Sequence, residues 1–205
     1  MRHLFLAIAL FALPSVTRAI EEPDYAVLRK LGEVEVRFYA PYVVAQVFVA
    51  GTENMADDMA EDKGVPVLAE YLFGKNRGEK QASWPAPITP GAVSTRLEMT
   101  APVTRISAAG GYMVRFVLPK RVSLESAPEP IDGRVQLRAI PERRLAAITF
   151  SGFWSEANYA EHLDKLKAAL RAADLSWSGE PVYARYNPPM TPWFMRRNEI
   201  WLALR

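Results

Sequence analysis

Hydrophobic and polar residues alternate along several stretches of this chain, which is the pattern of half-buried β-strands. The stretches that show it, or a β-branched run of similar length, are 25–30, 33–39, 43–50, 97–106, 112–119, 182–186 and 200–204. Breaks at Leu31-Gly32 and at Gly110-Gly111 favour tight turns between the neighbouring strands. Between these groups the segment 75–95 is rich in proline and long, and it predicts an irregular, mobile surface loop.

Two further segments repeat their hydrophobic residues with the period of an α-helix. The first covers about 53–73, and we expect it in two pieces, because Gly64 and Pro66 interrupt the pattern before Gly74 ends it. The second covers about 155–172. Its apolar face is formed by Tyr159, Leu163, Leu166 and Leu170. Strands with two helices predict the α+β class.

The segment 33–51 resembles the segment 134–152 without a gap, at an offset of 101 residues. The matched pairs include Val36 with Leu137, Arg37 with Arg138, Ala45 with Ala146, and Gly51 with Gly152. A helix and two more strands are predicted after each copy. The pattern indicates an internal duplication of a β-β-α-β-β unit. The alternative is chance similarity between two amphipathic strand pairs.

The chain contains no cysteine, which excludes disulfides, thiolate metal sites, covalent haem attachment through CxxCH and a cysteine nucleophile. With 205 residues it is long enough for one domain with its own core. No serine–histidine–aspartate elbow, metal-ligand cluster or phosphate-binding loop is visible, so we expect neither catalytic nor metal-binding residues.

Residues 1–19 have the pattern of a secretory signal peptide. Arg2 and His3 precede an apolar run from Leu4 to Leu13, and Thr17-Arg18-Ala19 places small residues before a cleavage site. An uncleaved membrane anchor is the alternative. We expect an exported protein, periplasmic or secreted, in which residues 20–205 form the only domain and no stable membrane span remains.

Removing the signal peptide changes the charge of the chain. The whole chain has 25 Lys and Arg residues and 23 Asp and Glu residues. Since residues 1–19 contain Arg2 and Arg18 and no acid, 23 of each remain. A balanced charge gives no reason to expect nucleic acid as a partner, and we expect a monomer. The remaining histidine is His162.

The segment 186–204 combines a strand, a stiff loop and a second strand. Pro188, Pro189 and Pro192 restrict the loop, which carries Met190, Trp193, Phe194 and Met195 before Arg196 and Arg197. Apolar surface beside two guanidinium groups suits a flat, apolar, anionic ligand. The alternative is a loop that closes its own barrel, with the arginines paired to nearby carboxylates.

Several strings in the chain together resemble the SOUL haem-binding protein family. They are Met99-Thr-Ala-Pro-Val103, Phe116-Val-Leu-Pro119, Phe150-Ser-Gly-Phe153, Tyr186-Asn-Pro-Pro-Met190 and Arg197-Asn-Glu-Ile-Trp201, and the resemblance runs from about Tyr25 to Leu204. It implies a pseudo-twofold, distorted antiparallel β-barrel of two ββαββ units flanked by two helices. It also implies non-covalent binding of haem or another tetrapyrrole between the first helix and the loop joining the last two strands.

The expected ligand-contacting residues lie on the first helix and on the last loop. The resemblance implies Met59, Leu68, Leu72 and Met190, and the residue types of the loop add Trp193, Phe194, Arg196 and Arg197. Other positions depart from the family. The histidine ligand of one branch corresponds to Phe38 here, and basic residues of the other branch correspond to Asp62, Glu70 and Thr191. His162 lies at the edge of a helix stripe, where we expect a structural histidine and not an iron ligand.

The function expected from the sequence is that of a tetrapyrrole carrier or buffer of the cell envelope. Two alternatives stay open: a binding module for another amphipathic small molecule, or a structural protein without haem binding. An enzyme is a further alternative. An acid–base set could be drawn from Glu98, Glu199 and His162, but acids at strand ends are usually surface charges.

Overall fold

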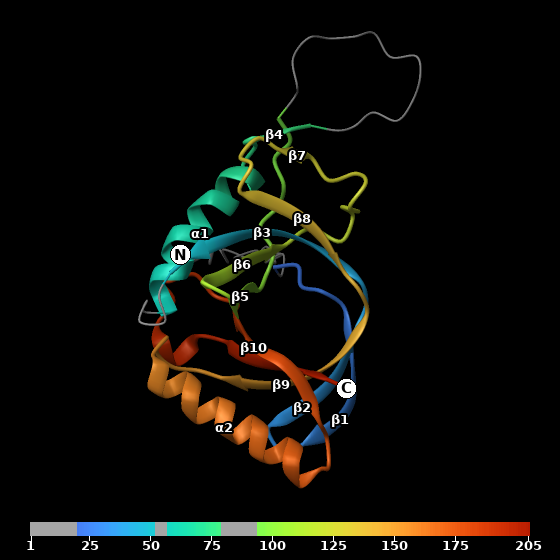
Figure 1. Ribbon diagram of the computed structural model, residues 1–205, viewed down its shortest axis with the longest axis vertical. Helices are drawn as coiled ribbons and strands as arrows, with labels where there is room; N and C mark the ends of the chain where they lie inside the picture. Colours follow the sequence, from blue (N-terminus) through green and yellow to red (C-terminus); the bar gives the residue numbers. More distant parts are fainter. Residues whose placement is uncertain (1–19, 52–56, 79–93) are drawn as a thin grey trace, which may run out of the picture.

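Nine strands of the protein form one curled antiparallel sheet, and two α-helices cover its outer side (Figure 1). The structure is a computed structural model and describes residues 20–51, 57–78 and 94–205. Its elements are β1 (Tyr25–Leu31), β2 (Val34–Tyr39), β3 (Tyr42–Ala50), α1 (Asp57–Leu72), β4 (Asn76–Arg77), β5 (Val103–Ala108), β6 (Gly111–Val117), β7 (Glu129–Pro130), β8 (Val135–Ile140), β9 (Arg143–Phe150), α2 (Glu156–Ala172), β10 (Trp177–Arg185), the short 3-10 helix η1 (Trp193–Met195) and β11 (Asn198–Leu204).

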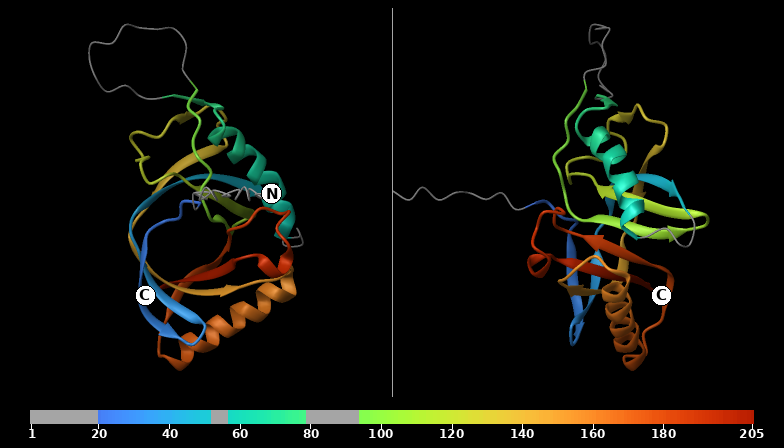
Figure 2. Two further views of the ribbon diagram at one scale, coloured as in Figure 1. Left: turned by 180° about the vertical axis from the view of Figure 1, so that it is seen from behind. Right: turned by 90° about the vertical axis from the view of Figure 1, so that its left-hand side faces the viewer.

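The order of the strands in the sheet is symmetric. It runs β1-β2-β9-β11-β10-β5-β6-β3-β8, and β4 pairs separately with β7. Exchanging β2, β9, β11 and β10 with β8, β3, β6 and β5 gives the same order read from the other end. Figure 2 shows the two halves along the long axis, one with α1 and the other with α2. This is the arrangement expected of two ββαββ units, while the duplication itself stays a prediction.

A continuous two-stranded ribbon joins the ends of the sheet and gives it the form of a distorted barrel. β2 leads directly into β3, and β8 leads directly into β9. The pairing Tyr39↔Arg143 between β2 and β9 continues as Tyr42↔Ile140 between β3 and β8, without a shift in register. Because the ribbon bends at Pro41 and Pro141, each of its strands serves both halves. The predicted barrel with two flanking helices is therefore confirmed.

Helix α1 covers β3, β6 and β8 as one uninterrupted helix, and the predicted break at Gly64 and Pro66 is wrong. Gly64 serves packing, because a Cβ there would lie 2.9 Å from the Val114 side chain of β6. Helical turns on both sides of Pro66 are buried against the sheet, and this packing outweighs the lost N–H. The predicted end at Gly74 is confirmed, with φ at +113°.

Helix α2 packs on β9 and β11 through the predicted stripe. Tyr159, Leu166 and Leu170 are buried, and Leu163 packs beside them. Ser155 caps the start, because its hydroxyl accepts a hydrogen bond from the Asn158 N–H at 3.3 Å. Among the described residues, no helix is both long and apolar enough to cross a bilayer.

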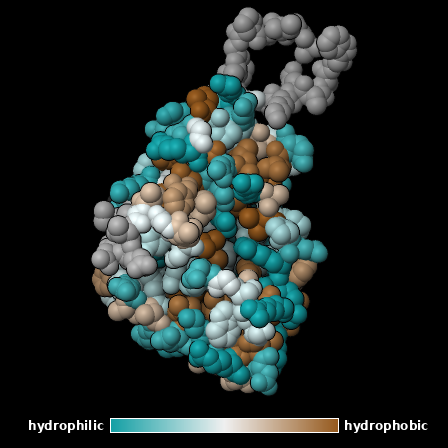
Figure 3. Space-filling view, viewed as in Figure 1, coloured by the Kyte–Doolittle hydropathy of each residue, from teal (hydrophilic) through white to brown (hydrophobic). Residues whose placement is uncertain are grey.

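The inner side of the sheet carries the alternate residues of the same strands. In the half with α2 this face holds Tyr39, Leu145, Ala147, Ala184 and Trp201, which pack together. The outer surface is mixed: Figure 3 shows a mostly hydrophilic face on which hydrophobic side chains gather in separate patches. In this half, the inner face of the sheet is therefore covered by a buried cluster of aromatic and aliphatic side chains.

Most predicted strands agree with the observed ones to within two residues, and the hairpin at Gly110-Gly111 is confirmed as the β5–β6 turn. Two predicted starts are wrong, because β5 begins six residues after residue 97 and β10 begins five residues before residue 182. The predicted signal peptide lies outside the described residues, as does most of the predicted loop 75–95. Asn76 fixes both described ends of this loop, because its side chain donates to the Thr95 carbonyl and accepts from the Thr95 N–H.

Gly111 should be irreplaceable at the start of β6. A Cβ there would lie 2.1 Å from the Val49 carbonyl oxygen of β3. We expect Gly111→Ala to lower the free energy of unfolding by about 1–3 kcal/mol, since the backbone of β3 must move. The measurement is urea unfolding followed by circular dichroism.

Gly133→Ala is the matched control, because a Cβ at Gly133 would meet no atom within 4 Å. This variant should be neutral or more stable by up to about 1 kcal/mol. Equal stabilities of the two variants would show that β3 and β6 are not packed this closely.

Candidate functional site

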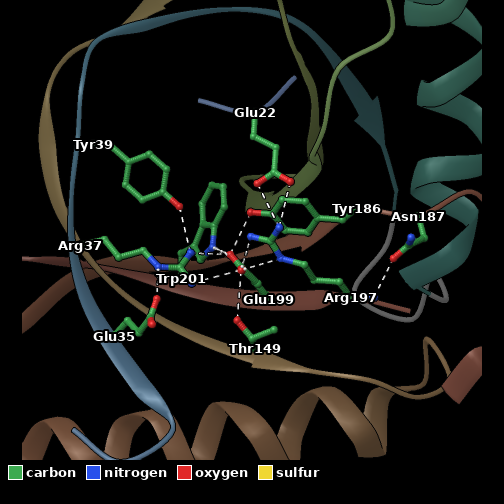
Figure 4. Close-up of polar contacts among 10 residues, drawn as sticks. All are labelled: Glu22, Glu35, Arg37, Tyr39, Thr149, Tyr186, Asn187, Arg197, Glu199 and Trp201. Atoms are coloured by element: carbon green, nitrogen blue, oxygen red, sulfur yellow. Dashed lines mark hydrogen bonds and ion pairs between the residues drawn. The ribbon is translucent and has the colours of Figure 1, made fainter. Parts of the chain in front are cut away.

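The carboxylate of Glu199 in β11 has no exposed surface and lies at the centre of the inner face (Figure 4). Arg37 donates to it twice, from Nη1 to Oε2 at 2.8 Å and from Nη2 to Oε1 at 3.2 Å. Arg197 donates from Nη2 and Nε to Oε1, at 2.9 and 3.2 Å. The Tyr186 hydroxyl and the Trp201 indole N–H donate to Oε2, at 2.9 and 2.7 Å. Two cations and several neutral donors therefore hold one buried anion.

The strand period brings these groups to one face. Glu199 and Trp201 are two residues apart in β11, so both side chains point inward. Thr149 faces Glu199 directly across the β9–β11 ladder, and its hydroxyl donates to Oε1 at 3.1 Å. The buried carboxylate thus ties together β2, β9 and β11 and the residues that follow β10.

Arg37 in β2 is buried and makes further contacts within its own strand. Its Nε donates to Glu35 at 2.9 Å, and its Nη1 also donates to the Tyr39 hydroxyl at 3.1 Å. The guanidinium carbon lies 4.4 Å from the centre of the Tyr25 ring in β1. Two carboxylates, a hydroxyl group and an aromatic ring therefore contact the guanidinium group of Arg37.

Arg197 connects the Glu199 cluster with the segment that precedes β1. Its Nη1 donates to both oxygens of Glu22, at 2.9 and 3.1 Å, and its guanidinium lies 3.7 Å from the centre of the Tyr186 ring. Its backbone N–H donates to the Asn187 side chain at 2.7 Å, which closes the base of the 186–197 loop. The sequence-predicted ligand residue Arg197 therefore pairs with carboxylates of its own chain.

Electrostatics keep Glu199 ionised. Burial alone would raise the pKa of its carboxyl, but hydrogen bonds and charge from Arg37, the charge of Arg197 and the Trp201 N–H lower this pKa overall. Burial and the negative charge of Glu199 raise the pKa of Tyr186 well above its usual range, so this hydroxyl stays protonated and donates. The cluster holds its protonation state across physiological pH.

A hollow of about 430 Å³ opens beside this cluster. Its lining includes Lys30, Glu33 and Glu35 as well as Arg37 and Arg197. Within the part of the chain that the structure describes, no group of three His, Cys, Asp or Glu residues could hold a metal ion. Since the groups around Glu199 satisfy one another, we assign the cluster a structural role.

The loop 188–196 presents the predicted apolar residues to solvent. Met190 is 87% exposed, Phe194 61% and Trp193 48%, and Met195 is exposed beside them. Trp193 and Phe194 are in edge-to-face contact, with ring centres 5.6 Å apart. The structure therefore brings three of the predicted ligand residues together on one exposed surface.

Arg196 belongs to the scaffold of this loop. Its Nε donates to the Thr191 carbonyl at 2.8 Å and its Nη2 to the Pro189 carbonyl at 2.7 Å. The guanidinium also lies 4.1 Å from the centre of the Trp154 ring. These contacts hold the loop in one conformation and occupy two of the five guanidinium N–H donors.

The predicted residues of the first helix lie elsewhere. Leu68 and Leu72 are fully buried between α1 and the sheet, so in this conformation they offer no surface to a ligand. The side chain of Met59 lies outside the described part of the structure. The role of these residues in ligand contact stays a prediction.

Phe153 was not among the predicted site residues and extends the loop surface. It is 60% exposed and stacks on Trp193, with ring centres 5.1 Å apart and planes inclined by 21°. Gly152, with φ at +117°, directs the chain there, and its N–H donates to the Trp193 carbonyl at 3.0 Å. The Phe150-Ser-Gly-Phe153 string is recognisable in the sequence, but the residue on which Phe153 stacks, Trp193, is distant in the sequence.

His162 has the structural contacts expected of it. Its Nδ1–H donates to the Asn158 carbonyl at 2.8 Å, and its ring stacks on Phe150 with centres 4.1 Å apart. It lies on α2 and is not part of the loop surface. The residues present therefore fit the apolar face of a tetrapyrrole, and the loop surface supplies no histidine for its iron.

Comparison with known proteins identifies the family of this chain. The sequence profile of the family SOUL heme-binding protein matches residues 20–203. Heme-binding protein 1 of Xenopus laevis is 26% identical over 145 residues, which cover 70% of this chain and 70% of that protein. Heme-binding protein 1 of Mus musculus is 35% identical over 79 residues, which cover 38% of this chain and 41% of that protein.

Solved structures show the same fold at low sequence identity. The EcmrR C-terminal domain has a TM-score of 0.56 and 12% identity, and the match covers 86% of this chain and 99% of that one. A hydrolase from Listeria innocua has a TM-score of 0.55 and 13% identity, with coverage of 84% and 92%. At such identities these matches establish the shared fold alone.

The Glu199 cluster predicts a large loss of stability on neutralisation. Glu199→Gln removes the anion but leaves Arg37 and Arg197 in place, so the free energy of unfolding at pH 7 should fall by about 3–5 kcal/mol. Because the folded-state pKa of Glu199 is lowered, its contribution is present above pH 4.5, its usual value, and is lost as the pH falls below it.

The measurement is urea unfolding of both proteins between pH 3 and pH 8. The difference between wild type and Glu199→Gln should be constant from pH 8 down to about pH 5 and should shrink below pH 4.5. Glu180→Gln is a control, because Glu180 is an exposed glutamate of the neighbouring strand β10. A difference that does not change with pH would show that the carboxylate charge is unimportant.

Proposed function

Because the chain belongs to the SOUL heme-binding protein family, we propose that it binds haem or a related tetrapyrrole non-covalently, as a carrier or buffer and not as a catalyst. The profile match over residues 20–203 supports this function, and so do the relatives named Heme-binding protein 1. The observation that carries the location is the exposed aromatic and thioether surface of the 188–196 loop with Phe153.

The shape of this surface suits a flat ring. Phe153 and Trp193 stack, and Phe194 stands at 87° to Trp193, so aromatic faces and edges are available side by side. Met190 and Met195 add flexible thioethers that adapt to a ligand. Large apolar side chains gathered on an exposed loop are characteristic of interaction sites.

The loop is rigid before any ligand arrives, which favours binding. Arg196 fixes it through the carbonyls of Pro189 and Thr191, and the Thr191 N–H donates to the Pro188 carbonyl at 3.0 Å. A surface that is already ordered loses little conformational entropy when it binds. Met190, Trp193, Phe194 and Phe153 would hold the ring by apolar contact, and bound haem would supply a Soret absorption band that changes on binding as the signal.

A second candidate is another flat amphipathic molecule on the same surface. The family's histidine position holds Phe38, and Arg196 and Arg197 are engaged within the protein. The apolar part of a haem site is therefore better provided than its iron or carboxylate contacts. Tighter binding of a flat amphipathic molecule that is not a tetrapyrrole than of hemin would favour this candidate.

Phe194→Ala tests the location of the site. Loss of this aromatic contact should weaken hemin binding by about 1–3 kcal/mol, and Trp193→Ala should act similarly. Arg196→Ala should change it by less than about 1 kcal/mol, provided that the loop keeps its conformation. The measurement is a Soret titration, with circular dichroism to verify the fold.

Phe73→Ala is the matched control, because Phe73 undergoes the same chemical change and is 49% exposed. It directly follows the C-terminal end of α1 and is not part of the loop surface. Its hemin affinity should equal that of the wild type. If Phe194→Ala and Trp193→Ala bind as well as the wild type, the loop only closes the barrel and the site lies elsewhere.

We also propose that the protein is exported. The support is the signal-peptide pattern of residues 1–19 together with a family match that begins at residue 20. The intact mass of the protein from its native host should correspond to a chain starting near Ile20, and the protein should be found outside the cytoplasm. A full-length cytoplasmic species would refute export.

A further inference from the structure

Three arginines share the inner face of the half that contains α1. Arg115 lies in β6, Arg138 in β8 and Arg143 at the start of β9. Their neighbours on this face, Val44 and Val117, pack inside the barrel and not under α1. Within the described ranges, no carboxylate lies within 4.0 Å of any of these guanidinium groups. Three positive charges thus face one space without an anion.

Polar neutral groups surround these charges. The Arg115 Nε donates to the Gln46 amide oxygen at 2.9 Å, and the Arg143 Nη2 donates to the Tyr42 hydroxyl at 2.9 Å. Gln136 accepts weak hydrogen bonds from Gln46 and Arg138, at 3.4 and 3.5 Å. Amides and a hydroxyl orient the guanidinium groups but do not neutralise them.

Arg115 and Arg143 are in unfavourable surroundings for a charged guanidinium group. Burial lowers the pKa of Arg115, and the positive charge of Arg143 lowers it further. The Nε of Arg143 is buried and has no hydrogen-bond partner within the described part of the protein. A buried guanidinium N–H without an acceptor is costly, and a bound anion would remove this cost.

The half of the barrel that contains α2 has a carboxylate at the position that corresponds to this face. Arg138 lies 101 residues after Arg37, whose charge is neutralised by Glu199. In the half with α2, Glu199 lies opposite Thr149 in the β9–β11 ladder. The residue that corresponds to Thr149 in the other half is Phe48, at the offset of 101, and Phe48 lies opposite Met113 in the β3–β6 ladder. Met113 therefore occupies the position that corresponds to the carboxylate. One half carries its anion in the sequence, and the other half has a methionine in that place.

The face is also accessible. Phe48, Gln136 and Arg138 are exposed, while Met113 and Arg115 are half-buried. The face thus combines side chains that are in contact with solvent with an arginine, Arg115, that is partly desolvated.

We propose that the inner face of β3, β6 and β8 is an anion-binding site, in which Arg115, Arg138 and Arg143 hold a phosphate or carboxylate group of a small molecule. The planar guanidinium fork matches both groups, and its hydrogen bonds to an anion are stronger than those to neutral acceptors. Gln46 and Tyr42 keep two of the forks in place. The site is separate from the apolar loop surface.

Inorganic phosphate is the probe. It should raise the melting temperature of the wild type in a saturable way at constant ionic strength, whereas sodium chloride of equal ionic strength should not. Arg143→Gln and Arg138→Gln should each weaken phosphate binding by about tenfold. Without phosphate, Arg143→Gln should be as stable as the wild type or more stable, because a like charge has been removed.

Arg144→Gln is the matched control, since Arg144 is the next residue of β9, is exposed and lies on the opposite face of the strand. It should respond to phosphate like the wild type. Equal responses of all variants, or a chloride effect as large as that of phosphate, would overturn the proposal. If Arg143→Gln does not fold, the exposed Arg138→Gln decides the outcome.

A hemin titration of Arg138→Gln then identifies the source of the anion. A fall in hemin affinity parallel to the fall in phosphate affinity would assign the site to the carboxylates of a tetrapyrrole. Unchanged hemin affinity with lost phosphate binding would assign it to a separate small anion. Both results support the site, and the phosphate experiment alone can refute it.

Discussion

A single buried carboxylate determines much of this structure. Glu199 has no contact with solvent, and an isolated charge in that place would be very unfavourable. It is stable there because Arg37, Arg197, Tyr186 and Trp201 all donate to it. These donors come from β2, from β11 and from both ends of the 186–197 loop. The requirement to surround one anion therefore fixes the curl of the sheet and the base of the loop together.

The two halves of the barrel carry different charged residues at corresponding positions of their inner faces. Their strands occupy equivalent places, but Glu199 corresponds to Met113 and Trp201 corresponds to Arg115 through the pairings of their ladders. In one half the buried anion is consequently neutralised by arginines of the same chain. The other keeps three guanidinium groups beside amides and a hydroxyl. A symmetric backbone with asymmetric charge therefore gives one half whose anion belongs to the chain and one half whose three guanidinium groups have no carboxylate partner among the described residues.

The sequence revealed what depends on local periodicity and not what depends on remote partners. Strands and α2 followed their apolar pattern, because each has one buried face. Pro66 was misinterpreted, since the packing of α1 on β6 outweighs its local preference. Arg197 was predicted as a ligand residue with carboxylate pairing as the alternative. One partner, Glu199, is two residues away and could have indicated the pairing, whereas the other, Glu22, is 175 residues away and has no local signal.

The arrangement of the loop separates two tasks that its sequence combines. Arg196 and Arg197 point back into the protein, and their donors are used by Pro189, Thr191, Glu22 and Glu199. The apolar side chains beside them point outward. The charge of Arg197 is neutralised by Glu22 and Glu199, whereas Arg196 bonds to carbonyl oxygens and keeps its charge. We therefore expect a ligand on this surface to be held mainly through its flat apolar face, with Arg196 beside it as a positive charge.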